Sequence, residues 1–166
     1  MKRIIVIGSP GAGKSIFSRR LREETGIPLF YLDMLWHRPD KTNVSAEEFD
    51  RKLDEILQQD MWIIDGNYLR TLRPRLDACD TVFFLDYPLE VCLEGAKSRI
   101  GKEREDMPWK ETKFEEEFRQ YIIDFPKDQL PQMYQMLEEY KDAKKLIIFY
   151  SREEAEEYWR NEKGNL

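Results

Sequence analysis

The chain has no apolar run long enough to cross a bilayer, and the run at residues 4–7 is too short for a signal peptide. It has only two cysteines, Cys79 and Cys92, and their spacing is not that of a metal site, which predicts reduced thiols. Positive charge is not in excess either. The formal net charge of −6 argues against direct binding of DNA or of a membrane surface. These absences favour a cytoplasmic protein of enzyme size.

Internal repeats and low-complexity segments are also absent, and the length of 166 residues fits a single domain, 1–166, with one sizeable core. Short apolar runs alternate with amphipathic stretches, which is the pattern of an α/β fold with a parallel sheet. Parallel strands are buried on both faces, so they read as continuous apolar runs. We expect strands at residues 3–7, 29–32, 62–64, 82–85 and 146–150.

Helices are predicted between and after these strands. Gly26 marks the end of the first helix, and Ser45 with Glu48 forms a capping box that begins the second. An aromatic stripe with helical spacing ends at Pro126 and is interpreted as core. The expected helices cover residues 14–25, a segment from 45, a segment after Pro88, then 114–125, 130–137 and about 152–160.

A glycine-rich segment directly follows the first apolar run and fits the pattern G-x-x-x-x-G-K-[ST] at every fixed position. Its glycines permit positive φ angles and let a ligand approach the backbone closely. Successive N–H groups then form an anion nest, and the N-terminus of the next helix adds its positive dipole end. The predicted nucleotide-binding residues are Gly8, Ser9, Pro10, Gly11, Ala12, Gly13, Lys14, Ser15 and Ile16.

The end of this motif predicts a bound nucleoside triphosphate with its metal ion, ATP and Mg²⁺. Lys14 is expected to reach the outer phosphates as a mobile charge, and the Ser15 hydroxyl to ligate Mg²⁺. GTP is the alternative nucleotide. The chain has no Asn-Lys-x-Asp motif for reading a guanine base, which weakens the GTPase interpretation.

Three of the apolar runs lead into an aspartate, at Asp33, Asp65 and Asp86. The carboxyl ends of strands face the ligand crevice in open α/β sheets, so all three are candidate site residues. Asp65 is predicted to be the second Mg²⁺ ligand, directly or through water. Asp86 precedes Pro88 at a helix start and is assigned to helix capping.

The residue after Asp65 bears on the type of reaction. Many ATPases place a glutamate there to orient a water molecule, whereas this chain has Gly66. Without evident machinery for activating water, the site is better suited to transferring phosphate to a bound acceptor.

Asp33 precedes a segment that contains Trp36 and the lone histidine, His37. A carboxylate beside the phosphate loop can accept a hydrogen bond from an acceptor hydroxyl, orienting it or acting as general base. A helix cap or a loop tie is the alternative role. Trp36 and His37 are candidates for lining an acceptor pocket, although a solvated loop position is favoured for His37 taken alone.

The basic residues fall into two groups. Arg70 is predicted to reach an acceptor phosphate or carboxylate in the cleft, because its planar fork suits anions. Arg99 and Arg104 are predicted to belong to a closing lid that brings cations onto the transferring phosphoryl group. A solvated surface is the alternative for this second group, since acidic residues are interspersed. The full groups are Arg70, Arg73 and Arg75, and Lys97, Arg99, Lys102 and Arg104.

The order of these features resembles the adenylate-kinase-like small P-loop kinases. Within them, the chain is most similar to the DNA topology modulation proteins, the FlaR-related group, over nearly its whole length. The phosphate loop is specific only to the superfamily, and the other segments narrow the resemblance to the group. Those segments are Tyr31-Leu32-Asp33-Met34-Leu35-Trp36, Trp62-Ile63-Ile64-Asp65-Gly66-Asn67-Tyr68 and Gly101-Lys102 with Asp106-Met107.

The resemblance implies a P-loop NTPase fold of three α/β/α layers. Its sheet would have five parallel strands in the order 2-3-1-4-5, with helices on both faces and a mobile lid at about residues 99–126. It also implies that Lys14 and Ser15 hold ATP–Mg²⁺, that Asp65 supports the metal and that Arg99 and Arg104 are lid arginines. Nucleoside monophosphate kinases commonly carry Asp-Gly-Phe-Pro-Arg after the third strand. Here the arginine is shifted to Arg70, which weighs against a monophosphate acceptor.

Three functional hypotheses follow. The first is a kinase that transfers the γ-phosphoryl group of ATP to a nucleotide, a nucleoside or a small hydroxylated metabolite. The second is a nucleotide-binding regulator that affects DNA topology or gene expression without kinase turnover, although no DNA-reading element is recognisable. The third is a slow ATPase. The acceptor stays unidentified at this stage, and a monomer is the default expectation, with a dimer as the alternative.

Overall fold

The computed structural model describes residues 1–165. Its centre is a sheet of five parallel strands in the order β2-β3-β1-β4-β5, which confirms the predicted order. The strands are β1 (Arg3–Gly8), β2 (Leu29–Tyr31), β3 (Trp62–Asp65), β4 (Thr81–Leu85) and β5 (Lys145–Phe149). Each lies within one or two residues of a predicted strand.

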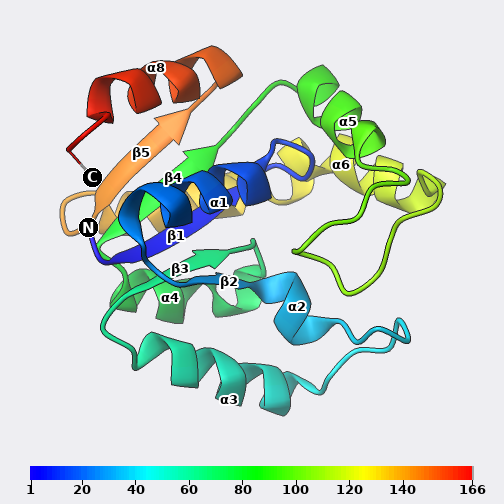
Figure 1. Cartoon of the computed structure of the whole chain (residues 1–166), viewed down its shortest axis with the longest axis horizontal. Helices are drawn as coiled ribbons and strands as arrows, with labels where there is room; N and C mark the ends of the chain where they lie inside the picture. The colour runs from blue at the N-terminus through cyan, green and yellow to red at the C-terminus, as the bar shows by residue number, and fades with distance from the viewer. Residues whose placement is uncertain (166) are drawn as a thin grey trace.

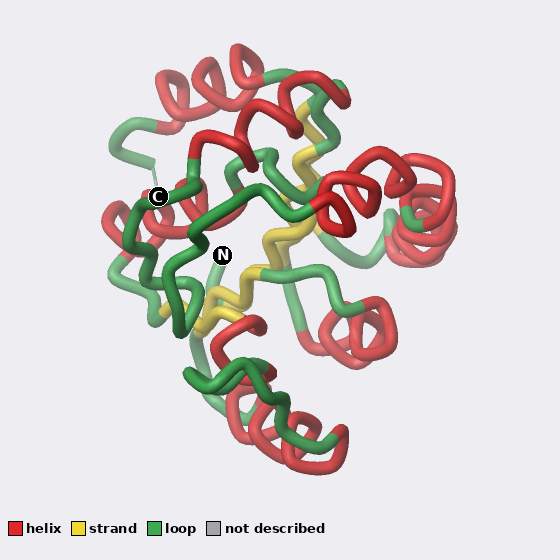
Figure 2. The backbone as a smooth tube through the Cα atoms, turned by 90° about the vertical axis from the view of Figure 1, so that its right-hand side faces the viewer, coloured by secondary structure: helices red, strands yellow, loops and turns green. Residues whose placement is uncertain are grey.

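Helices cover both faces of this sheet, and Figure 2 shows the strands as a twisted band between them. The helices are α1 (Lys14–Thr25), α2 (Leu32–Trp36), α3 (Ala46–Leu57), the short 3-10 helix η1 (Leu69–Thr71), α4 (Leu72–Ala78), α5 (Leu89–Ser98), α6 (Glu116–Asp128), α7 (Leu130–Tyr140) and α8 (Arg152–Glu162). None of the helices within residues 1–165 has both the length and the apolar character needed to span a membrane.

Successive side chains of each strand point to opposite faces of the sheet, so the apolar core forms two layers, one on each face. In β1, Ile5 and Ile7 pack against α3, α4 and α7, whereas Ile4 and Val6 face α1, α5 and α8. All four side chains are fully buried, as expected for a central strand covered on both faces. The three-layer α/β/α architecture therefore follows from the strands' continuous apolar runs.

The predicted helix signals are confirmed at two ends and fail at a third. Gly26 ends α1 in a left-handed conformation, and Ser45 caps α3 by accepting a hydrogen bond from the Glu48 N–H. Pro126 does not end α6, which continues to Asp128. A proline removes one N–H but leaves the following turn intact, and the Gln129 N–H still bonds to the Phe125 carbonyl.

Three short helices that begin beyond the carboxyl ends of strands were not predicted. These are α2, directly after β2, and η1 with α4, which follow β3. The loop of residues 99–115 between α5 and α6 lies at the same end of the sheet (Figure 1), and we call it the lid loop. Its base is held by a hydrogen bond from the Gly101 N–H to the Glu111 carbonyl, 2.7 Å long.

Candidate active site

The phosphate loop joins β1 to α1, so it lies at the carboxyl end of the central strand. Lys14, the first residue of α1, donates hydrogen bonds to the carbonyls of Gly8 and Ser9, each 3.1 Å long. Burial lowers the pKa of its ammonium group, while the carboxylates of Asp65 and Asp33 oppose that shift. The ammonium group is thus held by the loop carbonyls, where the charges of Asp65 and Asp33 still act on it.

The loop owes its shape partly to a close approach of α5. A Cβ atom on Gly95 would collide with the Gly11 carbonyl oxygen, and a Cβ on Gly11 would collide with the Cys92 carbonyl. Gly11 also has a φ of 83°, which L side chains rarely adopt. The two glycines therefore let loop and helix pack backbone against backbone.

Asp65 ends β3 next to the loop and is 7% exposed. Burial raises its pKa to about 7, and the nearby Lys14 charge opposes this effect. Within residues 1–165, no group of three or more histidine, cysteine or acidic side chains is arranged to hold a metal ion. A cation at Asp65 would therefore need further ligands from a bound molecule.

The turn after β3 is tied to the phosphate loop by Asn67. Its side-chain amide accepts from the Gly8 N–H at 3.0 Å and donates to the Gly8 carbonyl at 2.8 Å. Arg75, fully buried, holds the same turn from below by donating to the carbonyls of Gly66, Asn67, Tyr68 and Thr71. Burial lowers the pKa of its guanidinium group to about 9. The phosphate loop and the turn after β3 therefore form one hydrogen-bonded unit.

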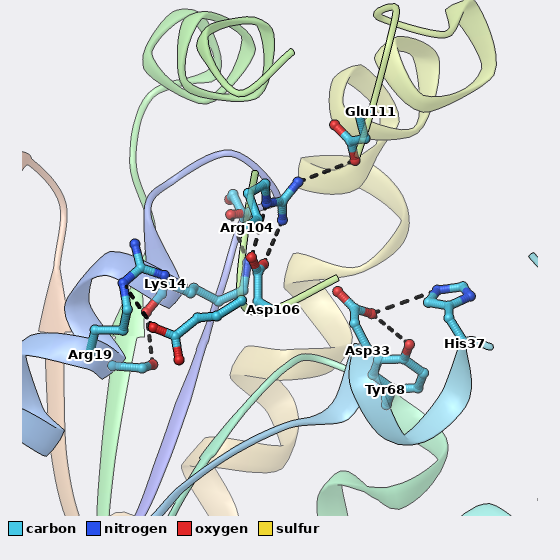
Figure 3. A network of polar contacts seen from close by, with 11 residues as sticks. Lys14, Arg19, Asp33, His37, Tyr68, Arg104, Asp106 and Glu111 are labelled. Carbon is cyan, nitrogen blue, oxygen red and sulfur yellow. Dashed lines mark hydrogen bonds and ion pairs between the residues drawn. The ribbon is translucent and has the colours of Figure 1, made fainter. Parts of the chain in front are cut away.

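Asp33, in the first turn of α2, lies opposite this unit. Its Oδ1 accepts a hydrogen bond of 2.6 Å from the Tyr68 hydroxyl, and the Nε2 of His37 lies 3.9 Å from the same oxygen (Figure 3). The other imidazole nitrogen, Nδ1, is 3.0 Å from the Asn43 side-chain oxygen. Burial and the Asp33 charge raise the pKa of the Tyr68 hydroxyl, so it stays a donor.

The two predicted lid arginines, both in the lid loop, differ in their contacts with acidic side chains. Arg104 forms ion pairs with Asp106 at 2.5 Å and with Glu111 at 3.2 Å (Figure 3). The Nε of Arg99 is buried without a hydrogen-bond partner among the described residues, and burial lowers the pKa of its guanidinium. Of the two lid arginines, Arg99 is therefore the one available to a ligand.

Two cavities meet at the phosphate loop. The Asp33 cavity, of about 490 Å³, lies between the loop, α2, the turn after β3, the lid loop and α6. The Arg152 cavity, of about 410 Å³, lies between the loop, α1, α5 and the start of α8. Gly11, Gly13 and Ser15 line both, together with residues of the lid loop. The phosphate loop thus forms part of the wall of both cavities.

The structure brings most predicted site residues to these cavities. Within the phosphate loop, Gly8, Ser9 and Ala12 are buried and do not line either cavity. Arg70 is not brought there: it pairs with Asp50 at 2.8 Å on the protein surface. The predicted residues that line a cavity are Pro10, Gly11, Gly13, Lys14, Ser15, Ile16, Asp33, Asp65, Arg99 and Arg104.

Two further expectations about single residues, Trp36 and Asp86, were wrong, and for His37 the pocket-lining alternative is supported over the favoured solvated one. Trp36 packs edge-on against Phe49 and does not line the Asp33 cavity, whereas His37 does line it. Asp86 does not cap a helix; it accepts a hydrogen bond from the Tyr134 hydroxyl. The short helix α2 explains the positions of Trp36 and His37, because it turns neighbouring side chains in different directions.

Sequence reasoning missed several residues of the Asp33 cavity. Phe118 and Tyr121 were interpreted as core, but they line the cavity, and only Ile122 and Phe125 of that stripe are buried. Helical spacing shows that residues share a face without showing what that face meets. The cavity residues that were missed include Tyr31, Tyr68, Leu69, Asp106, Met107, Trp109, Glu111, Phe118, Tyr121 and Gln129.

Comparison with known proteins gives the same picture of the fold. No protein-family model matches the chain. The chain is 30% identical over 94 residues to adenylate kinase from Thermotoga neapolitana, covering 55% of this chain and 42% of that enzyme. The chain thus spans less than half the length of the curated relatives it matches.

Solved structures match over more of the chain. A shikimate kinase from Acinetobacter baumannii, in complex with shikimate, has a TM-score of 0.61 at 19% identity and covers 99% of this chain and 94% of its own. A gluconokinase from Sinorhizobium meliloti has a TM-score of 0.50 at 14% identity, covering 91% and 83%. The chain therefore has the α/β/α fold found in small P-loop kinases.

Proposed function

We propose that the protein is a small-molecule kinase that transfers the γ-phosphoryl group of ATP to an acceptor in the Asp33 cavity. The observation that carries this proposal is the position of the phosphate loop between two cavities. A hydrolase needs room for one nucleotide and a water molecule, whereas a second cavity of about 490 Å³ suits a second substrate.

ATP would occupy the phosphate loop and the Arg152 cavity. Lys14 would exchange its bonds to the loop carbonyls for bonds to the outer phosphates. Ser15 and Asp65 fit a magnesium ion held mainly by phosphate oxygens, because Asp65 is a buried carboxylate that lacks a full counter-charge. When bound, that ion would neutralise charge on the transferring group.

The acceptor would bind between Asp33 and the phosphate loop. Asp33 would orient the acceptor hydroxyl or take its proton, and Tyr68 would hold the carboxylate in place. Arg99 would stabilise charge on the phosphoryl oxygens, since it lines both cavities and its Nε has no hydrogen-bond partner within residues 1–165. We assign Arg104 to ordering the lid loop through Asp106 and Glu111.

The similarity to adenylate, shikimate and gluconate kinases supports a kinase, and an adenylate-kinase-like activity in particular is one form of the proposal. The alternative of a DNA-affecting regulator, which the FlaR-related resemblance suggested, depended partly on the cluster of Arg70, Arg73 and Arg75. Arg70 pairs with Asp50, Arg73 pairs with Glu139, and Arg75 is buried. The cluster therefore offers little free charge to a phosphate backbone, and we favour the kinase.

Binding of ATP–Mg²⁺ to Lys14→Ala tests the nucleotide part of this proposal. A hydrogen bond to a charged group contributes roughly 1.5–3 kcal/mol, so we expect the affinity to fall by about 10- to 100-fold. Lys127→Ala, an exposed position in α6, serves as the matched control and should bind like wild type. Equal affinity of Lys14→Ala and wild type would remove the core of the proposal. Phosphate transfer to a panel of acceptors, followed by ³¹P NMR, tests the kinase step separately.

A further inference from the structure

Some of the charged side chains that line the Asp33 cavity are held in ion pairs, and others are free to contact a ligand. Three are cationic, Lys14, Arg99 and Arg104, and four are acidic, Asp33, Asp65, Asp106 and Glu111. Lys14 and Asp65 belong to the phosphate loop and its neighbour β3, where the triphosphate is expected. Arg99 is assigned above to the transferring phosphoryl group. The charged side chains left for an acceptor are therefore Asp33, Glu111 and the Arg104–Asp106 pair.

Arg104 is not available to an anionic acceptor. Its Nε and one terminal nitrogen bond to the two oxygens of Asp106 at 2.9 and 2.5 Å, and its other terminal nitrogen reaches Glu111 at 3.2 Å (Figure 3). Its side chain is only 11% exposed, so these bonds are little screened by water. A phosphate or carboxylate on the acceptor would have to displace two carboxylates from one guanidinium.

The walls of the same part of the cavity are aromatic. Trp109 of the lid loop meets the His37 ring edge-on, with 5.0 Å between ring centroids. Phe118 and Tyr121 are stacked with 6.4 Å between centroids, and Tyr121 is 44% exposed, although large aromatic side chains are usually covered. Flat, partly open aromatic faces are surfaces on which a planar ring can stack.

Asp33 presents one oxygen to this space. Its Oδ1 accepts from the Tyr68 hydroxyl and faces His37, whereas Oδ2 has no hydrogen-bond partner within residues 1–165. An acceptor hydroxyl can therefore donate to Oδ2 while the Tyr68 bond holds the carboxylate still. In the transfer step, the hydroxyl oxygen forms a bond to the γ-phosphorus, the bond from that phosphorus to the bridging oxygen of ADP breaks, and the hydroxyl proton passes to Oδ2.

From this juxtaposition of a paired Arg104, aromatic faces and a free carboxylate oxygen, we infer that the acceptor is a hydroxylated molecule with a planar ring and no phosphate or carboxylate group, a nucleoside being the simplest representative. The inference rests on the proposed kinase function and narrows its substrate class. It excludes nucleoside monophosphates and sugar acids, because Arg99 is assigned to the transferring phosphoryl group and Arg104 is held by Asp106 and Glu111.

The test compares each nucleoside with its own 5′-monophosphate by isothermal titration calorimetry, with and without a non-hydrolysable ATP analogue and Mg²⁺. We expect at least one nucleoside to bind about tenfold or more tightly than its monophosphate in the Asp33 cavity. Equal or tighter binding of the monophosphates would overturn the inference, and so would the absence of binding by every nucleoside. Loss of analogue binding alone would instead contradict the proposed function, because the titrations without analogue still judge the acceptor class.

Two variants assign the preference to the residues that carry it. Glu111→Gln removes one partner of Arg104, and we expect it to strengthen monophosphate binding severalfold while nucleoside binding changes less. Trp109→Ala removes a stacking face and should weaken nucleoside binding about tenfold. Lys127→Ala, outside both cavities, should change neither. Unchanged selectivity in both cavity variants would show that the acceptor binds elsewhere and would overturn the inference.

Discussion

On one side of Lys14 the cavity wall is backbone packed against backbone, and on the other side it is made of side chains from separate elements. Gly11 and Gly95 bring the phosphate loop and α5 together without any intervening Cβ. The Asp33 cavity instead combines Asp33 of α2, Tyr68 after β3 and the side chains of the lid loop and α6. Few substitutions are compatible with the first wall, which we call the backbone wall. In the second, which we call the side-chain wall, single residues can be replaced independently.

This difference indicates a division of tasks. A backbone wall recognises the part of a ligand that is the same in every nucleoside triphosphate, since N–H groups do not depend on side-chain identity. A side-chain wall recognises what distinguishes one acceptor from another. Substitutions in the backbone wall should therefore change nucleotide affinity, and substitutions in the side-chain wall should change acceptor binding or turnover.

The largest expected effect comes from the side-chain wall. Asp33→Asn removes the charge at Oδ2 and keeps the size of the side chain, so we expect the turnover rate to fall by about 10²- to 10⁴-fold if Asp33 is the general base. ATP affinity, measured by calorimetry, should stay within about twofold, because Asp33 lies outside the backbone wall. A decrease near tenfold would indicate an orienting role only.

Asp54→Asn is the matched control for this substitution. Asp54 is an exposed aspartate on α3, away from both cavities, and its variant should keep both turnover and ATP affinity. If Asp33→Asn weakened ATP binding as much as turnover, the two sides of the site would not be separable in the way described above.

A smaller effect is expected from the backbone wall, where a substitution should change stability and ATP affinity and leave acceptor binding unchanged. Replacing glycine by alanine inside a helix ordinarily stabilises it by about 1 kcal/mol. At Gly95 the added methyl group would collide with the Gly11 carbonyl, so we expect Gly95→Ala to destabilise the protein by about 1–3 kcal/mol. ATP affinity should fall by about tenfold because the loop is displaced, as calorimetry can measure.

The neighbouring exposed residue provides the control, since Glu94→Ala changes α5 without touching the loop. Acceptor binding by Gly95→Ala, measured without nucleotide, should match that of wild type. A Gly95→Ala variant with improved stability and normal ATP affinity would contradict the close packing of α5 on the phosphate loop.

The two walls also differ in how far the sequence could predict them. The phosphate loop is local: its residues are adjacent in the chain, and their spacing alone fixes what they bind. The sheet could be predicted equally well, because each strand is a continuous apolar run and the resemblance to known kinases implied the strand order. Asp65 followed from the same reasoning, as it directly ends such a run.

The Asp33 cavity depends on contacts between residues far apart in sequence. The Tyr68 hydroxyl meets Asp33 across 35 positions, and no periodicity signals such a pair. Arg70 and Arg75 look alike in the sequence, yet one pairs with Asp50 on the surface and the other is buried under the turn after β3. Spacing could not separate them, because η1 and α4, which set their directions, were not predicted.

The smallest expected effect concerns Asp65, which lies where the two walls meet. Burial raises its pKa from the ordinary value of 3.8 to about 7, so the folded protein holds a proton between those pH values that the unfolded chain releases. Its contribution to stability is therefore fully present below about pH 4 and is lost as the pH rises through 7. The slope is at most about 1.4 kcal/mol per pH unit. Urea unfolding of protein free of nucleotide and Mg²⁺, at pH 5 and pH 6, measures it.

Asp65→Asn removes this titration, so its stability relative to wild type should increase by about 1 kcal/mol between those two pH values. Asp54→Asn should follow wild type over the same range, since its side chain is exposed. A constant difference between wild type and Asp65→Asn would mean that Asp65 is already ionised at pH 5. In that case the Lys14 side chain would neutralise the carboxylate in the absence of ligand, and it would supply the counter-charge that we assign to Mg²⁺.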